Sequence, residues 1–149
     1  MGIFFYVQKG TLYNSTSSPI PFEIEKLNTG GAMNLASGVF TAPKSGTYFF
    51  SFSGVAHISA SSSAPLRLGL FIHLYRNGIA VGSGEADDYS VTDEHETTSI
   101  HIQSTLDLKI GDRIWLTKIA DVSQGVYLDD TINQLTHFTG WLVQEKVNF

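Results

Sequence analysis

Cysteine is absent from this chain of 149 residues, and charged side chains make up only 15% of it. Without cysteine, the chain has no disulfides, no thiolate zinc site and no cysteine nucleophile. It also lacks an apolar run of about 18 residues, so we expect no transmembrane helix. Nine Lys and Arg residues form no basic stripe and are outnumbered by 14 Asp and Glu residues, which argues against nucleic-acid binding.

The local motifs of common enzymes are absent as well. The five histidines show neither His-x-x-x-His nor His-Glu-x-x-His spacing, and the chain contains no Gly-x-Ser-x-Gly elbow. It has no glycine-rich phosphate loop of either common spacing. We therefore expect a binding protein rather than an enzyme. A Ser-His-Asp triad stays an open alternative, because its members assemble from distant parts of a sequence.

What the sequence does contain is short alternating runs between turn residues. Tyr48, Phe50 and Phe52 alternate with other residues, and a period of two places all three on one face of a strand. Asn77-Gly78 follows one such run, over residues 66–75, and predicts a hairpin turn. The length suits one domain over residues 1–149. Many short strands at this spacing predict an all-β sandwich.

The landmarks along the chain resemble the signature of the globular C1q domain. They are Phe22, Asn28, Met33, Phe40 and the run Gly46, Tyr48, Phe50 and Phe52. The family usually has an aromatic residue or Leu where this chain has Met33, a mild change because Met is a flexible apolar residue. Residues 108–116, 125–127 and 138–143 resemble the closing strands of the family, so the resemblance covers nearly the whole chain.

The resemblance implies a ten-stranded jelly-roll β-sandwich, shared with tumour necrosis factor ligands, that assembles as a compact homotrimer and is secreted. Five aromatic residues bear on assembly, because they fall opposite the predicted core rows: Phe49, Phe71, Tyr75, Trp115 and Trp141. A lone monomer does not usually expose so many aromatic rings. Either the second sheet covers them or neighbouring subunits do, and we expect a mixture of both.

Residues 85–96 hold six carboxylates and form the best candidate for a metal site, which we expect in a region between strands. Calcium takes six to eight oxygen ligands from flexible loops, and some C1q domains bind calcium in a corresponding loop. We therefore name Asp87, Asp88 and Asp93 as candidate calcium ligands. A solvated acidic loop that only aids solubility is the alternative. Asp129 and Asp130 form a second acidic pair, which either joins a site in space or caps a turn.

Tyr89 and Tyr127 are candidate ligand-binding residues, because they fall where the family presents variable loops. A tyrosine in a loop offers a ring for stacking on a sugar and a hydroxyl for hydrogen bonding. Packing of each ring beneath its own loop is the alternative.

The resemblance implies a non-enzymatic, trimeric pattern-recognition protein of innate immunity that binds carbohydrate on microbial or other cell surfaces. A secreted signalling ligand of the cerebellin or adiponectin type, which engages a protein receptor, is the second hypothesis. A lectin binds polysaccharide in a calcium-dependent way. A signalling ligand holds one protein partner through a buried, aromatic-rich patch.

Overall fold

The computed structural model describes residues 2–11, 13, 19–59, 66–90, 95–120, 126–128 and 135–147. These residues contain strands and no helix. The strands are β1 (Phe4–Gln8), β2 (Ile24–Thr29), β3 (Met33–Asn34), β4 (Val39–Thr41), β5 (Gly46–Ser59), β6 (Leu66–Arg76), β7 (Ile79–Ser90), β8 (His95–Leu108), β9 (Arg113–Ala120), β10 (Val126–Leu128) and β11 (His137–Glu145). The predicted all-β class is confirmed, with eleven strands in the described residues rather than ten, the shortest of which has two residues.

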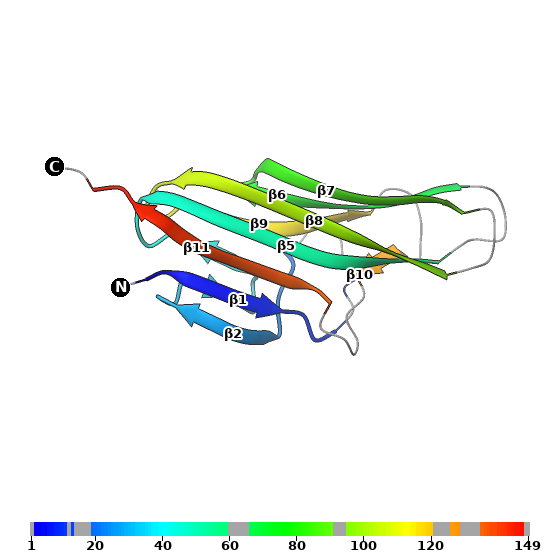
Figure 1. Cartoon of the computed structure of the whole chain (residues 1–149), viewed down its shortest axis with the longest axis horizontal. Helices are drawn as coiled ribbons and strands as arrows, with labels where there is room; N and C mark the ends of the chain where they lie inside the picture. The colour runs from blue at the N-terminus through cyan, green and yellow to red at the C-terminus, as the bar shows by residue number, and fades with distance from the viewer. Residues whose placement is uncertain are drawn as a thin grey trace.

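Two antiparallel sheets form the sandwich (Figure 1). The first sheet has the order β10-β5-β11-β1-β2, with β8 paired to the other side of β5, and the second has the order β3-β4-β9-β6-β7. The starts of β1 and β5 and the ends of β6, β8 and β11 lie at one end of the sandwich, which we call the base. Segments that are far apart in the sequence therefore meet at the base.

An aromatic core fills the space between the sheets. Tyr48, Phe50 and Phe52 are each at most 1% exposed, which confirms that the three share the inner face of β5. Phe40 in the second sheet lies 5.3 Å from Phe50 and 5.6 Å from Tyr48, between ring centroids and with edge-on geometry. Such pairs add about 0.5–1.5 kcal/mol each beyond the burial of their area.

The sequence landmarks take identifiable places in this core. Phe22 is 3% exposed and stacks on Phe138 with 5.8 Å between ring centroids. The Asn28 side chain holds the turn between β2 and β3, donating to the Met33 carbonyl at 2.7 Å and accepting from the Met33 N–H at 3.2 Å. Met33 is itself 3% exposed. The flexible Met side chain therefore fills the core at the landmark where the resemblance led us to expect an aromatic residue or Leu.

Candidate ligand-binding site

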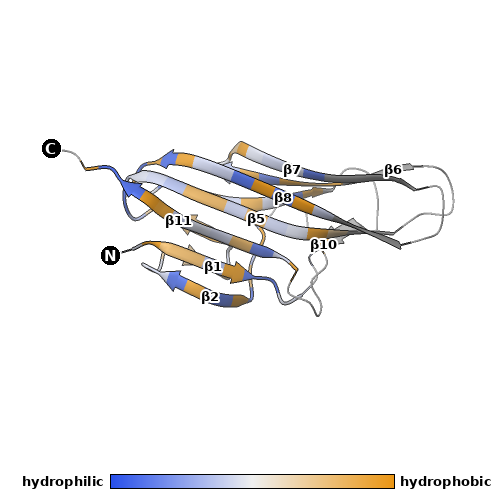
Figure 2. Cartoon of the chain, viewed as in Figure 1, coloured by the Kyte–Doolittle hydropathy of each residue, from blue (hydrophilic) through white to orange (hydrophobic). Residues whose placement is uncertain are grey.

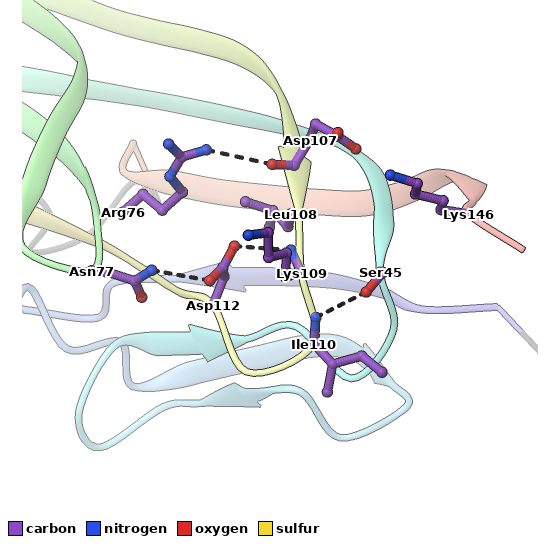
Figure 3. Close-up of a pocket in the computed structure, with 9 residues that line it drawn as sticks. All are labelled: Ser45, Arg76, Asn77, Asp107, Leu108, Lys109, Ile110, Asp112 and Lys146. Carbon is purple, nitrogen blue, oxygen red and sulfur yellow. Dashed lines mark hydrogen bonds between the residues drawn. The ribbon is translucent and has the colours of Figure 1, made fainter. Parts of the chain in front are cut away.

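The described residues form a pocket of about 580 Å³ at the base of the sandwich (Figure 3). Four segments contribute to it: the start of β5, the β6–β7 turn, the β8–β9 connection and the residue that follows β11. The pocket is lined by Ser45, Arg76, Asn77, Asp107, Leu108, Lys109, Ile110, Asp112 and Lys146. We call it the base pocket. Its volume is in the range of small-molecule sites.

The base pocket gathers positive charge in a protein that is acidic overall. Arg76, Lys109 and Lys146 are three of the nine cationic side chains in the chain, whereas Asp107 and Asp112 are only two of its 14 acidic ones. None of the three cations forms an ion pair with another described residue. The pocket therefore carries an excess of positive charge, which favours an anionic ligand.

A hydrogen-bonded frame fixes the wall of the pocket beside the β6–β7 turn. One Asp112 carboxylate oxygen accepts from the Lys109 N–H at 2.9 Å, and the other accepts from the Asn77 side-chain amide at 3.0 Å. The Asn77 side-chain oxygen in turn accepts from the Arg113 N–H at 2.9 Å. The Lys109 N–H, followed by the Asn77 amide, holds the pKa of Asp112 below its usual value. Asp112 therefore stays ionised and connects the β6–β7 turn to the β8–β9 connection through its hydrogen bonds.

The cationic groups approach the pocket from different elements (Figure 3). Arg76 ends β6 and is half-buried, and its guanidinium donates to the Asp107 carbonyl oxygen at 3.4 Å. Lys146 is exposed, and its backbone N–H donates to the Ser45 carbonyl at 2.8 Å, which fixes the chain beside the start of β5. Guanidinium has five N–H donors. Most donors of Arg76 thus have no acceptor among the described residues.

A second feature is an apolar stripe on the outer side of the first sheet. Leu27, Phe4, Trp141 and Phe49 form it, and we call these four residues the outer stripe. Phe4 is paired with Trp141 across β1 and β11, and Trp141 lies 4.8 Å from Phe49 between ring centroids. Leu27 is 50% exposed and Trp141 is 42% exposed. Leu27, Phe4 and Trp141 also line a groove of about 390 Å³.

The contribution of β1 to the outer stripe is Phe4, an apolar side chain on the outer face of a strand whose inner face is also apolar. Figure 2 shows hydrophobic colour along most of this strand. Phe5 and Val7 point into the core and are at most 1% exposed, whereas Phe4 is 37% exposed on the opposite face. A core-forming strand needs only its inner face to be apolar. The outer side chain of Phe4 is therefore available for contact with another molecule.

The outer side of the second sheet carries a smaller aromatic group. Tyr75 and Trp115 are directly paired across β6 and β9, and their rings stack with 5.9 Å between centroids. Both side chains are half-buried, as are Phe49 and Phe71. The part of the expected mixture in which the second sheet covers these aromatic residues is wrong, because they alternate with the buried residues of their strands and lie on the outer faces. The part in which neighbouring subunits cover them stays a prediction.

The first half of the acidic segment forms a strand and not the expected region between strands. Residues 85–90 belong to β7, where Asp87 pairs with Gly69 and Asp88 pairs with Leu68. The β6–β7 hairpin keeps its ladder from its turn to Ser90, so strand pairing outweighs the low strand preference of acidic residues. Asp93, Asp129 and Asp130 lie outside the described residues. Among the described residues, no group of three His, Cys, Asp or Glu is positioned to hold a metal ion. The calcium site stays a prediction.

The two candidate tyrosines also belong to strands rather than loops. Tyr89 pairs with Arg67 near the end of β7, and Tyr127 pairs with His57 in the short strand β10. These strands belong to different sheets. The backbone placement therefore does not bring Tyr89 and Tyr127 together as strand neighbours, and their role in binding stays a prediction.

Two buried lysines were not singled out from the sequence. Lys9 and Lys118 are each 1% exposed, and burial lowers the pKa of Lys118. Lys118 lies on the inner face of β9, in register with Ile72. No local pattern marks either residue, because burial of a lysine depends on partners elsewhere in the chain. Lys9 follows β1 and is considered below with its partner Glu23.

Comparison with known proteins agrees with the fold. A family model described as C1q domain matches residues 4–143. Human Complement C1q tumor necrosis factor-related protein 3 is 31% identical over 114 residues, which cover 76% of this chain and 42% of that protein. Zebrafish Caprin-2 is 37% identical over 99 residues, which cover 66% of this chain and 10% of Caprin-2. The chain thus spans less than half the length of these relatives.

A solved structure extends the comparison to nearly the whole chain. The globular domain of zebrafish complement 1qA protein superimposes with a TM-score of 0.68 at 18% identity, covering 97% of this chain and 99% of that one. This likeness supports the jelly-roll sandwich predicted from the sequence. With the family match over residues 4–143 and the buried Phe22, Met33 and Tyr48 at the predicted landmarks, we conclude that this chain belongs to the C1q domain family.

Proposed function

We propose that this domain acts by binding and not by catalysis, as a secreted homotrimer that recognises clustered targets. The outer stripe is the observation that carries the proposal. Leu27, Phe4 and Trp141 are 50%, 37% and 42% exposed on one side of the first sheet, together with a groove. Contiguous exposed apolar surface of this kind usually marks a contact with another molecule. Because the chain belongs to the C1q domain family, we propose that the molecule in contact with the outer stripe is another copy of this chain.

The mechanism is multivalent recognition. Three identical sets of binding residues, held by rigid sandwiches, convert a weak single-site affinity into avidity when targets are closely spaced. Microbial surface glycans are the proposed targets, which gives the protein a role in innate immunity. Tyr89 and Tyr127 remain candidate sugar contacts, and Asp87, Asp88 and Asp93 remain candidate calcium ligands.

A secreted signalling ligand is the second candidate. The similarity to human Complement C1q tumor necrosis factor-related protein 3, which extends over 76% of this chain, supports it, because the name of that protein relates it to the tumour necrosis factor ligands. Such a ligand engages one protein receptor through a buried patch with a few dominant aromatic residues. The half-buried pair Tyr75 and Trp115, on the second sheet, offers a patch of this kind.

Solution mass by light scattering, first in calcium and then in a chelator, is the test of assembly. We expect the mass of three chains in calcium. A monomer in both solutions would remove the avidity mechanism. Binding to bacteria and to purified polysaccharide, compared between the trimer and a monomeric variant, then separates the two candidates. Glycan binding that depends on trimerisation supports pattern recognition, whereas a lack of glycan binding favours the signalling ligand.

A further inference from the structure

We propose that the base pocket binds an acidic sugar, that is, a sugar residue that carries one sulfate, phosphate or carboxylate group. This inference deepens the proposed binding function by naming a class of ligand. It concerns a single chain and is independent of trimer formation. It also places recognition at the base of the sandwich, in residues that the sequence analysis did not name as candidate site residues.

The cations supply the anion subsite. The Arg76 guanidinium uses a single long hydrogen bond, at 3.4 Å to the Asp107 carbonyl, and its remaining donors have no acceptor among the described residues. A guanidinium presents its donors as a planar fork that matches the oxygens of carboxylate, phosphate and sulfate. Lys109 and Lys146 line the same pocket without ion-pair partners in the described chain. They add positive charge around the position where the anion binds.

The Asp107 carboxylate distinguishes a sugar from a simple polyanion. Asp107 is exposed, lines the pocket, and uses only its backbone carbonyl in the contact with Arg76. A free carboxylate repels a densely charged polymer, but it is a strong acceptor for hydroxyl groups. Three cations and one free carboxylate around a single pocket therefore suit a ligand with one anionic group and several hydroxyls.

The pocket is also rigid enough to select a ligand. Asn77 and Asp112 are held by the hydrogen bonds that brace the two turns, and the Ser45 hydroxyl accepts from the Ile110 N–H at 3.1 Å. Ile110, which is 69% exposed, contributes an apolar part of the lining against which a sugar ring can pack. Preorganised groups avoid the entropy cost of ordering on binding. A volume of about 580 Å³ leaves room for a single sugar residue and its anionic group.

The test uses three probes that separate the chemical contributions: glucose 6-sulfate, glucose and inorganic sulfate. Each probe is titrated into isotope-labelled protein while backbone and side-chain amide shifts are followed by NMR. We expect glucose 6-sulfate to bind at least tenfold more tightly than either of the others, with shifts at Asn77, Lys109 and Ile110. Glucose 6-phosphate and glucuronate, titrated in the same way, distinguish the three sources of the anionic group.

Two variants test the assigned roles. We expect Arg76→Gln to weaken binding of glucose 6-sulfate and of inorganic sulfate, each by about tenfold, because a charged fork is lost. We expect Asp107→Asn to weaken glucose 6-sulfate several-fold while inorganic sulfate binds at least as tightly as before. Lys26→Gln removes an exposed positive charge from β2 and is the matched control, with no change expected. Lys146→Gln, at an exposed position, replaces Arg76→Gln if that variant does not fold.

Four results would overturn the inference. They are absence of binding in the millimolar range, shifts confined to residues outside the pocket, glucose 6-sulfate affinity unchanged in Arg76→Gln, and tighter binding of both sulfate probes to Asp107→Asn. The last result would mean that the pocket attracts anions in general and that Asp107 does not recognise the sugar. Because the probes are monovalent, their affinities do not depend on avidity. A failure here is therefore distinguishable from a monomeric mass, which would count against the proposed function.

Discussion

The Lys9 ammonium donates a 3.0 Å hydrogen bond to the Glu23 carboxylate from a side chain that is only 1% exposed. It also donates to the Pro21 carbonyl at 2.8 Å and lies 5.1 Å from the centre of the Tyr13 ring and 5.9 Å from that of Phe22. One buried cation therefore ties the segment after β1 to the segment before β2. Buried charges persist only when they are paired and hydrogen-bonded in this way.

Replacement of Lys9 by alanine tests the importance of this cation for stability. We expect Lys9→Ala to lower the free energy of unfolding by about 3 kcal/mol, because it removes the donor to the Pro21 carbonyl and to one Glu23 oxygen and opens a cavity in place of a buried side chain. Urea denaturation followed by tryptophan fluorescence measures the change. Lys44→Ala is the matched control, because its 3.5 Å pair with Glu145 is exposed and contributes less than about 1 kcal/mol. Equal losses in the two variants would contradict the prediction.

The pKa of Glu23 predicts how stability depends on pH. Burial alone would raise this pKa, but the Gly10 N–H, the Lys9 ammonium and the Thr11 hydroxyl together lower it below its usual value. A carboxyl with a lowered pKa in the folded state contributes stability above its unfolded value of about 4.3. That contribution is lost as the pH falls through the folded pKa.

Comparison of wild type with Glu23→Gln isolates this contribution. We expect the variant to be less stable than wild type at pH 7, and the difference in unfolding free energy to shrink as the pH falls below about 4.3. Chemical denaturation at a series of pH values gives the difference directly. A difference that stays constant down to the lowest pH would mean that the Glu23 charge does not contribute.

The core could be predicted from the sequence because it depends on local alternation. Tyr48, Phe50 and Phe52 occupy one face through the geometry of a strand alone, and each is at most 1% exposed. The Asn77-Gly78 turn was predictable for the same reason, since both residues adopt positive φ angles, 52° and 89°, that favour Asn and Gly. Periodicity and turn preferences depend on a few neighbouring residues, so they can be recognised from the sequence alone.

The candidate site could not be predicted, because it depends on segments that are distant in the sequence. Arg76, Lys109 and Lys146 meet only where β6, β8 and β11 end at the base. The ladder between β6 and β7 also includes Asp87 and Asp88, although their composition resembles a loop. Pairing with a neighbouring strand is a tertiary effect and outweighs local preference. Charges that are adjacent in the sequence, such as those of residues 85–96, are therefore recognisable from the sequence, whereas charges that only the fold brings together are not.

Gly140 allows close packing of the aromatic core. A Cβ atom at this position would lie 2.7 Å from Phe5 Cε1 and 2.7 Å from Phe50 Cδ1. Both rings are 1% exposed and have little room to move. We expect Gly140→Ala to lower the free energy of unfolding by about 2–3 kcal/mol through overpacking. Thermal and urea denaturation measure this loss.

The matched control for Gly140→Ala is Gly10→Ala. The nearest atom to an added Cβ at Gly10 is Ile24 Cδ1 at 3.5 Å, an ordinary contact, so we expect a change within about 0.5 kcal/mol. Phe50→Leu provides a second check, because a smaller side chain makes room for the methyl group. The double variant should then be more stable than the sum of the two single losses predicts. Strict additivity would rule out a clash with Phe50.

The outer stripe gives the last prediction, which concerns the proposed trimer. Leu27→Glu places a charge in the stripe at a side chain that is 50% exposed in the single chain, so the fold of the monomer should tolerate it. Burial of that charge against another copy is costly. We therefore expect the light-scattering mass to fall from three chains to one. Ile79→Glu is the control, because Ile79 is 71% exposed and belongs to β7 in the other sheet. If Ile79→Glu dissociates the assembly while Leu27→Glu leaves it intact, subunits associate through the second sheet, and the avidity mechanism would need a different arrangement of binding residues.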